Sequence, residues 1–249
     1  MAGNISTPGA SVVERALTIL ECFDLRHPAL TLTEISEKSN LPVSTTKRLL
    51  AQLGRWGAVE RLVDNRYRVG IRLWNIGIMA PQQRGIREAA MPMLYDLYGA
   101  TQETVQLVVL DGRQALCVEK VAGPNSAPTS TEVGGHLPLH ATAVGKCILA
   151  YSPKELVQEV INTGLTRVTP FSIVQPARLV AELRRIRQGG VAYSKEEMSV
   201  GAVSVAAPVL GPDDVLLGAL GIVVRATKRV DHLAPAVITA ARAIARFSG

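Results

Sequence analysis

The stretch that decides the fold is Leu41-Pro42-Val43-Ser44-Thr45-Thr46-Lys47-Arg48-Leu49-Leu50-Ala51-Gln52-Leu53. Read as a helix of about 3.6 residues per turn, it has two chemically distinct faces. One face carries Thr46, Leu49, Leu50 and Leu53, and the other carries Ser44, Lys47, Arg48 and, further along, Arg55. Pro42 suits the first helical position, where a missing N–H costs nothing. An outer face that opens with hydroxyls and cations, with no acid among them, is suited to a polyanion such as DNA.

Basic residues are concentrated around this helix. The 249-residue chain has a formal net charge of +6, with 47% hydrophobic and 19% charged residues, which indicates a globular protein. Between Leu41 and Arg87 there are nine basic residues and only two acidic ones, so this short segment outweighs the net charge of the whole chain. Such an excess is the electrostatic footprint expected of a DNA-binding surface. An aromatic content of 4% argues against binding by base stacking.

The sequence offers little for a metal, a disulfide or a membrane. Cys22, Cys117 and Cys147 are widely spaced and form no CxxC pair, so a structural zinc site is not expected, and an odd number suits a reducing compartment. Residues 1–10 contain no apolar signal core, and no run approaches the roughly 20 apolar residues of a membrane span. We therefore expect a cytoplasmic protein with no metal and no cofactor.

Two capped helices precede the deciding stretch, and a basic hairpin follows it. Ser11-Val12-Val13-Glu14 and Thr31-Leu32-Thr33-Glu34 have capping-box spacing, and the second helix is expected to end near Lys38, with Asn40 in the turn. The third helix should end near Trp56-Gly57, and residues 59–69 should form a hairpin that turns at Asp64-Asn65. This order predicts a winged helix-turn-helix DNA-binding domain over residues 11–70, after a flexible N-terminus of residues 1–10.

Residues 71–99 are expected to form two linker helices, interrupted around Pro81 and Pro92. Leu73, Trp74, Ile76 and Ile78 make this segment too apolar for a free linker. Two interpretations are equally open: the segment packs against a partner subunit, or it packs against its own domain.

Residues 100–249 alternate between strand and helix patterns. Residues 104–110 and 115–121 are β-rich and are joined at Asp111-Gly112, and two more strands are expected at 200–210 and 215–224. Residues 134–139 read as a loop. Helices are expected at 141–150, from Ser152 onward, at 176–188 and at 234–247. The pattern predicts an α+β domain around an antiparallel sheet.

With both parts placed, nearly the whole chain resembles the IclR-type bacterial transcriptional regulators. The motifs that carry the resemblance are Thr31-Leu32-Thr33-Glu34-Ile35, Ser44-Thr45 with Arg48-Leu49-Leu50, Tyr67-Arg68-Val69-Gly70, Thr101-Gln102-Glu103-Thr104-Val105, the run from Leu137 to Lys146, Glu196-Glu197 and Ala206-Ala207-Pro208-Val209. Each motif is weak alone, and their order and spacing make them specific together. The resemblance implies a DNA-binding winged helix, a GAF-like effector-binding domain, and homodimers or dimers of dimers.

The candidate DNA contacts are Ser44, Thr45, Lys47, Arg48, Arg55, Arg66 and Arg68. Arg48 has the geometry for a bidentate contact to guanine, while Ser44 and Thr45 suit base edges or phosphates. Arg55 lies near the helix C-terminus, where phosphate contact is expected. Arg66 and Arg68 share one strand face and are expected in the minor groove or on phosphates. The alternative for Lys47 and Arg48 is a solvated helix face, which the flanking capped helices and wing disfavour.

A candidate anion site lies at the helix that starts near Ala141, where free N–H groups and small residues suit a carboxylate. The alternative is a helix start packed inside the core. By the resemblance, the effector-binding positions are Leu137, Ala143, Val144, Ser194, Ser204, Gly221 and Val223. Since Gly221 and Val223 supply no side-chain hydrogen bond, we expect a roomy, apolar pocket for an aromatic or longer organic acid.

Together these patterns predict a ligand-responsive, sequence-specific regulator of an operon for the catabolism of an organic acid, with double-stranded operator DNA as its partner. Two other classes stay open: a small-molecule enzyme, and a non-specific DNA-binding protein. The sequence contains no G-x-S-x-G elbow and no convincing catalytic triad, which argues against an enzyme. The effector-like second domain argues against a purely architectural protein.

Overall fold

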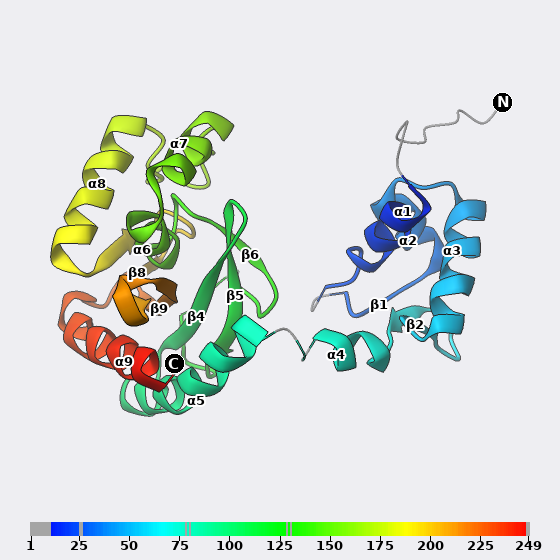
Figure 1. Cartoon of the computed structure of the whole chain (residues 1–249), viewed down its shortest axis with the longest axis horizontal. Coiled ribbons are helices and arrows are strands. Elements are labelled where there is room, and N and C mark those ends of the chain that lie inside the picture. Colours follow the sequence, from blue (N-terminus) through cyan, green and yellow to red (C-terminus); the bar gives the residue numbers. More distant parts are fainter. Residues whose placement is uncertain are drawn as a thin grey trace. The chain divides into compact units, whose positions relative to one another are not determined.

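The computed structural model describes residues 11–247 apart from 25, 26, 78, 80, 128 and 130, and leaves out the side chains of residues 81–84. Residues 1–10, expected to be flexible, and Ile78 of the expected linker lie outside the described residues. The chain divides into two compact units, Met1–Ala80 and Pro81–Gly249 (Figure 1).

The first unit is a winged helix-turn-helix. Its helices are α1 (Val12–Leu20), α2 (Leu32–Ser39), α3 (Val43–Trp56) and α4 (Ile71–Gly77). Its strands are β1 (Ala29–Leu30), β2 (Val59–Arg61) and β3 (Tyr67–Val69), in an antiparallel sheet of order β1-β3-β2. The two-residue strand β1 was not predicted, because two residues show no periodicity and only pairing with β3 defines them.

Local signals determine most helix ends in this unit. Both capping boxes form, at Ser11 with Glu14 and at Thr31 with Glu34. Asn40 ends α2 in the left-handed region at φ 51°. Pro42 is the N-cap of α3 and not its first helical residue, because its ψ of 139° is extended. The helix therefore begins one residue later than predicted, at Val43.

The apolar face predicted for the third helix forms the core of this unit. Thr46, Leu49 and Leu50 of α3 are buried, and they lie in a core shared with Ile19 and Ile35. Gly70 is required where β3 meets α4, since a Cβ there would lie 2.2 Å from the carbonyl oxygen of Gly57. The Gly70 N–H donates to the carbonyl of Ala58 at 2.8 Å, which ties the wing back to the end of α3.

The second unit is built on one six-stranded antiparallel sheet of order β6-β5-β4-β9-β8-β7. In chain order the strands are β4 (Thr104–Asp111), β5 (Gln114–Val121), β6 (His136–Pro138), β7 (Ala192–Lys195), β8 (Ala202–Leu210) and β9 (Leu216–Arg225). The four predicted strands are present. The predicted loop at 134–139 is wrong in part, because residues 136–138 pair with β5, and β7 was missed altogether.

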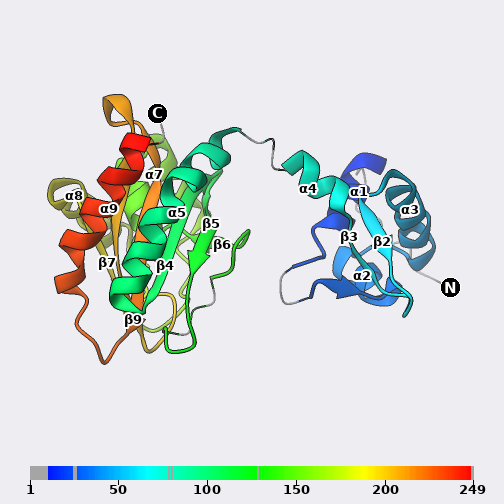
Figure 2. The same ribbon diagram turned by 90° about the horizontal axis from the view of Figure 1, so that it is seen from below.

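Helices cover both faces of this sheet (Figures 1 and 2). One face is covered by α5 (Pro81–Thr101) and α9 (Ala234–Phe247), which contact each other. The other is covered by α6 (Ala143–Tyr151) and α8 (Pro176–Gly189), with α7 (Lys154–Thr163) packed on the same core cluster. Two 3-10 turns, Pro212–Asp214 and Asp231–Leu233, complete the connections.

The predicted interruption at Pro92 is wrong, because α5 continues through it. A proline inside a helix removes one backbone hydrogen bond and strains the preceding turn. Here Ala90 and Leu94, on either side of Pro92, are completely buried in the core under the sheet. The burial of both outweighs the local cost, so tertiary packing overrides the sequence signal.

The two faces of the sheet differ in side-chain size. Leu220 and Ile222 of β9 point to the α5 and α9 face, whereas Ala219 and Gly221 point to the α6 face. At Gly221 an added Cβ would lie 2.6 Å from a methyl carbon of Val144 on α6. Small residues on this face therefore let the start of α6 approach the sheet closely.

Candidate DNA-binding and effector-binding sites

The recognition helix α3 presents the predicted cationic face to solvent. Ser44, Lys47, Arg48 and Arg55 are exposed, and Thr45 is half-buried. Lys47, Arg48 and Arg55 form no ion pair with any residue in the described part of the chain. Their charges are therefore compensated only by solvent and counter-ions, the state from which counter-ion release favours phosphate binding.

The wing, which is the hairpin of β2 and β3, differs from α3, because Arg66 and Arg68 form ion pairs with acidic residues. Arg66 pairs with Asp64 at 2.7 Å, and Arg68 pairs with Glu60 at 2.8 Å from the neighbouring strand. The hydrogen bonds from Arg66 lower the pKa of Asp64, so this carboxylate stays ionised beside it. Each carboxylate occupies part of the guanidinium and lowers the local positive charge that a phosphate would meet.

Sequence reasoning missed a third wing cation. The side chain of Arg61 is exposed, donates to Asn65 Oδ1 at 2.8 Å and lies 5.9 Å from the centre of the Tyr67 ring. The feature of the sequence that could have indicated Arg61 is its position at the end of the first hairpin strand, close to the turn. Arg72, by contrast, stacks 4.4 Å from the Trp56 ring and donates to the Trp56 carbonyl, so part of the basic excess caps α3 and is not free for DNA.

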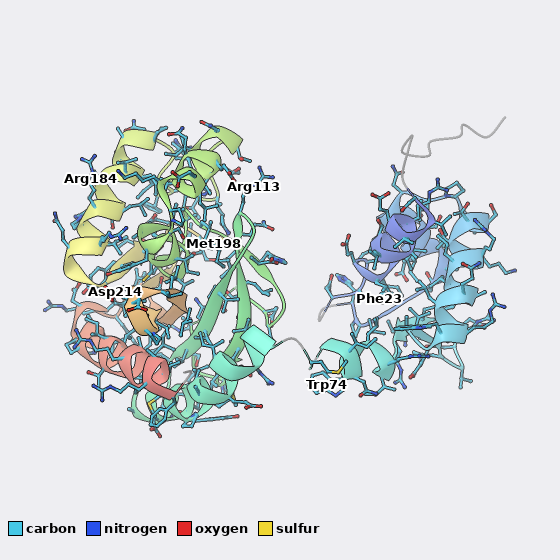
Figure 3. The ribbon with its side chains drawn as sticks, in the orientation of Figure 1. Phe23, Trp74, Arg113, Arg184, Met198 and Asp214 are labelled. Carbon is cyan, nitrogen blue, oxygen red and sulfur yellow. The ribbon has the colours of Figure 1, made fainter. Side chains whose placement is uncertain are left out.

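A small polar cavity of about 40 Å³ lies between the sheet and the start of α6. Its polar lining residues are Gln106, Thr129, Thr131, Thr142, Ser194, Ser199 and Ser204. Its apolar lining residues are Met198 (Figure 3), Ala202 and Val223. Among the described residues that line it none is charged, so they can meet a ligand charge only with hydroxyls, amides or backbone groups.

The structure brings together three of the predicted effector positions in this cavity. Ser194 pairs with Ser204 across β7 and β8, and Ser204 pairs with Val223 across β8 and β9, so all three lie in one row on one face. The other four predicted positions, Leu137, Ala143, Val144 and Gly221, are not among its lining residues. Gly221 provides room for Val144, as described above, and Leu137 is buried in the core.

The start of α6 closes one end of the cavity. Thr142 lines it and caps the helix, accepting a hydrogen bond from the Gly145 N–H at 3.0 Å. The next two N–H groups, of Ala143 and Val144, precede the first intrahelical donor and have no acceptor within the described chain. Ala143 and Val144 are buried, so the alternative of a core-packed helix start holds for their side chains.

The small cavity differs from the roomy, apolar effector pocket that the sequence predicts, and that pocket stays a prediction. The cavity has about 40 Å³, and seven of its ten lining residues carry a hydroxyl or amide group. The reason lies in strand register and loop packing, which bring Gln106 and three threonines to the site. Gln106, Thr129 and Thr131 were not among the candidates.

A buried ion pair holds the loop that forms the other wall. Lys146 of α6 is 1% exposed and lies 2.5 Å from Glu197 Oε1 and 4.0 Å from Glu182 Oε1. The backbone carbonyl of Glu197 also accepts from Ser172 Oγ at 2.7 Å. Since Met198 and Ser199 follow directly and line the cavity, these contacts position its wall.

Comparison with known proteins identifies the family. Residues 79–246 match the family model for the bacterial transcriptional regulator IclR C-terminal domain, and residues 12–62 match the IclR helix-turn-helix domain. The chain belongs to the IclR family of transcriptional regulators. It is therefore a regulator and not an enzyme, in line with its relatives, which are named as regulators and repressors.

The similarity to individual IclR-family proteins extends over most of the chain. The regulator XynR of Escherichia coli K12 is 34% identical over 221 residues, which is 88% of this chain and 87% of XynR. The Thermotoga maritima IclR structure has a TM-score of 0.75 at 30% identity and covers 94% of this chain and 97% of that one. An IclR homolog from Microbacterium hydrocarbonoxydans, crystallised with 4-hydroxybenzoate, has a TM-score of 0.90 at 26% identity and covers 96% and 99%.

Two features are absent from the described residues. No group of three or more His, Cys, Asp or Glu side chains is arranged to hold a metal ion. Within the same part of the chain, no helix has the length and apolar character needed to cross a membrane.

Proposed function

We propose that this IclR-family regulator recognises double-stranded operator DNA through Ser44, Thr45, Lys47 and Arg48 at the start of α3. The observation that carries the proposal is the exposure of Lys47 and Arg48 without an acidic partner in the described chain. Arg55 lies two turns further along the same face and is assigned to phosphate. Residues at the start of a recognition helix reach base edges, whereas later ones meet the backbone.

Substitution of Arg48 and Arg66 separates base reading from phosphate binding. Arg48→Ala should remove most of the preference for operator over random DNA, because a bidentate base contact discriminates by about 1–3 kcal/mol. Arg66→Ala should weaken binding to both DNAs and reduce the salt slope by up to about 0.9, the value of one phosphate contact. Binding is measured on both DNAs at several salt concentrations, and Arg184→Ala on α8 (Figure 3) is the control. Equal loss on both DNAs with Arg48→Ala would refute the base-reading role.

We propose that the protein acts as a homodimer, or as a dimer of dimers, that pairs partly through its first unit. Ile71, Trp74 (Figure 3), Ile76 and Met79, in and just after α4, are each at least 46% exposed, and so are Val12, Val13 and Leu17 on α1. Large exposed apolar side chains on each of these two helices suit an interaction surface. The second half of the predicted linker differs, because α5 is buried around Leu94 in the core of the second unit. Trp74→Glu should shift the molar mass in sedimentation toward the monomer, and Trp56→Phe should not.

We propose that an organic acid bound in the small polar cavity regulates DNA binding, and that the controlled operon serves the catabolism of that acid. The N–H groups of Ala143 and Val144, which directly follow the lining residue Thr142, and the hydroxyls of Ser194 and Ser204 suit a carboxylate. The structurally similar homolog crystallised with 4-hydroxybenzoate supports an acid as the ligand class. A panel of organic acids tests the site, because an acid that binds should raise the Tm of the protein. Ser204→Val should remove this rise and so test the location of the site. Ser152→Ala, which also removes a hydroxyl, is the control and should keep the rise.

A larger hollow of about 540 Å³ lies elsewhere in the second unit, lined in part by Tyr151, Gly190, Arg242 and Arg246. Helices α6, α8 and α9 all end beside it. Arginines at such a place compensate the carbonyl ends of helices, as Arg187 does for the carbonyl of Ala150. The small cavity is the better effector site, because it contains buried polar atoms without partners.

A further inference from the structure

The larger hollow of the second unit, of about 540 Å³, has the size of a ligand site and is lined by two cations without partners. Sites for small molecules typically have about 300–1,000 Å³. Arg242 and Arg246 of α9 (Figure 1) line the hollow, and both are exposed. Neither forms an ion pair or donates a hydrogen bond to another described residue. Both guanidinium groups are therefore available to a ligand.

The carbonyl ends of the neighbouring helices do not engage these two arginines. At the end of α6, Arg187 donates to the Ala150 carbonyl at 3.4 Å and lies 5.7 Å from the centre of the Tyr151 ring. Arg242 and Arg246 donate to no helix carbonyl in the described chain. They lie four residues apart on α9, where two like charges repel each other. Since no acid is among the described residues that line the hollow, a bound anion would relieve this repulsion.

The two cations match a phosphate monoester better than a carboxylate. A carboxylate carries one negative charge, whereas a phosphate monoester carries about −1.5 to −2 at pH 7 and has three acceptor oxygens. A guanidinium group binds phosphate oxygens through two parallel N–H donors. Two guanidinium groups therefore match one phosphate monoester in charge and in number of donors. The small polar cavity has no such cation among its described lining residues.

The rest of the lining favours an aromatic ring attached to the phosphate. Pro208 and Leu210 of β8 and Ile238 of α9 give the hollow an apolar wall, and the half-buried Tyr151 at the end of α6 adds an aromatic ring. A ligand ring that packs on this wall removes apolar surface from water and pairs with the Tyr151 ring. Inorganic phosphate or a phosphate on a polar chain would leave the wall solvated.

We infer that the larger hollow is a second ligand site, which binds a phosphate monoester that carries an aromatic ring, the class to which the nucleoside monophosphates belong. Arg242 and Arg246 bind the phosphate, and Tyr151 contacts the ring. The inference does not depend on the proposed organic-acid site, because the two sets of lining residues share no member.

Calorimetric titration of the full-length protein with matched compounds tests the inference. Phenyl phosphate should bind about tenfold more tightly than phenyl sulfate, which has nearly the same shape but a single negative charge, and benzyl alcohol should bind more weakly still. Phenyl phosphate should also bind about tenfold more tightly than inorganic phosphate or glycerol phosphate, which cannot use the apolar wall. Adenosine monophosphate compared with adenosine repeats the test of charge on a nucleoside.

Variants then locate the site. Arg242→Gln and Arg246→Gln should each weaken the binding of phenyl phosphate about fivefold, and about 25-fold together. Tyr151→Leu should weaken phenyl phosphate and leave inorganic phosphate unchanged. Arg184→Gln on α8 (Figure 3) replaces an exposed arginine outside the hollow and is the matched control. Arg48→Gln controls for phosphate binding at the recognition helix, and both controls should keep the natural affinity.

Thermal unfolding without ligand confirms that each variant is folded, and the exposed arginines provide the test if Tyr151→Leu does not fold. Equal affinity for phenyl phosphate and phenyl sulfate would reject the dianion, and equal affinity for phenyl phosphate and inorganic phosphate would reject the ring. An unchanged affinity in the double arginine variant, or an equal loss in either control, would reject the hollow as the site. If neither phenyl phosphate nor adenosine monophosphate binds, the inference fails, whereas the DNA-binding and organic-acid proposals are unaffected.

Discussion

Replacement of Lys146 by methionine should destabilise the second unit strongly. The Lys146 ammonium is 1% exposed and lies 2.5 Å from Glu197 Oε1. Glu197 is itself buried, and its Oε2 already has no partner among the described residues. Lys146→Met therefore leaves a buried carboxylate without its cation, and removing one partner of a buried pair costs about 3–5 kcal/mol. For a unit of this size, that corresponds to a fall in Tm of about 6–20 °C.

The double replacement distinguishes charge from shape. Lys146→Met with Glu197→Leu removes both charges and keeps similar volume, so it should recover most of the lost stability. Glu197→Gln should cost less than Lys146→Met, because Glu182 remains 4.0 Å from the ammonium. A double-mutant cycle from these variants gives the coupling between the two side chains.

The two tryptophans provide an internal control. Trp56 and Trp74 both belong to the first unit, so their fluorescence reports on that unit, while far-UV circular dichroism reports on both. Lys146→Met should lower the transition seen by circular dichroism and leave the tryptophan transition in place. If Lys146→Met and the double variant both unfold at the temperature of the natural chain, the buried charges contribute no such energy and the reasoning is wrong.

Three further predictions follow from close contacts and burial. Gly221→Ala should cost about 1–3 kcal/mol in thermal unfolding by overpacking against Val144, and an unchanged Tm would show that α6 can move away. Burial raises the pKa of Cys117 to about 12 and that of Cys147 further, so both thiols should resist a thiol reagent at pH 8 until the protein unfolds; rapid labelling of the native protein would contradict this. Thr31→Ala should lower the tryptophan-detected stability by about 1 kcal/mol through loss of the N-cap, and no change would mean that the cap is redundant.

The first unit was predicted from sequence almost element by element, because its signals are local. Capping boxes, a turn asparagine and an amphipathic period each act within a few residues, and the structure confirms them at Ser11, Thr31, Asn40 and α3. The errors have local origins too. Pro42 differs by one residue because its fixed φ is compatible with both positions and only its extended ψ makes it the N-cap, and β1 is too short for a pattern.

The cavity lining could not be predicted, because it depends on strand register and on loops far apart in the sequence. Gln106 reaches it from β4 and Met198 from the β7–β8 loop, while Thr129 comes from the segment before β6. The residues adjacent in sequence give no information about which distant residues come together at a cavity. The resemblance pointed to Ser194, Ser204 and Val223, which the structure brings together in the cavity, but gave no reason to consider Gln106.

The sequence by itself determined the family, the winged helix-turn-helix, the cationic face of α3 and the antiparallel α+β second unit, since each depends on periodicity and motif order along the chain. Only the tertiary structure decided which cations have partners, that α5 continues through Pro92, and that the cavity is small and polar. These properties are sums over contacts between distant residues. Ion pairing, burial and cavity shape exist only once the sheet register and helix packing bring those residues together.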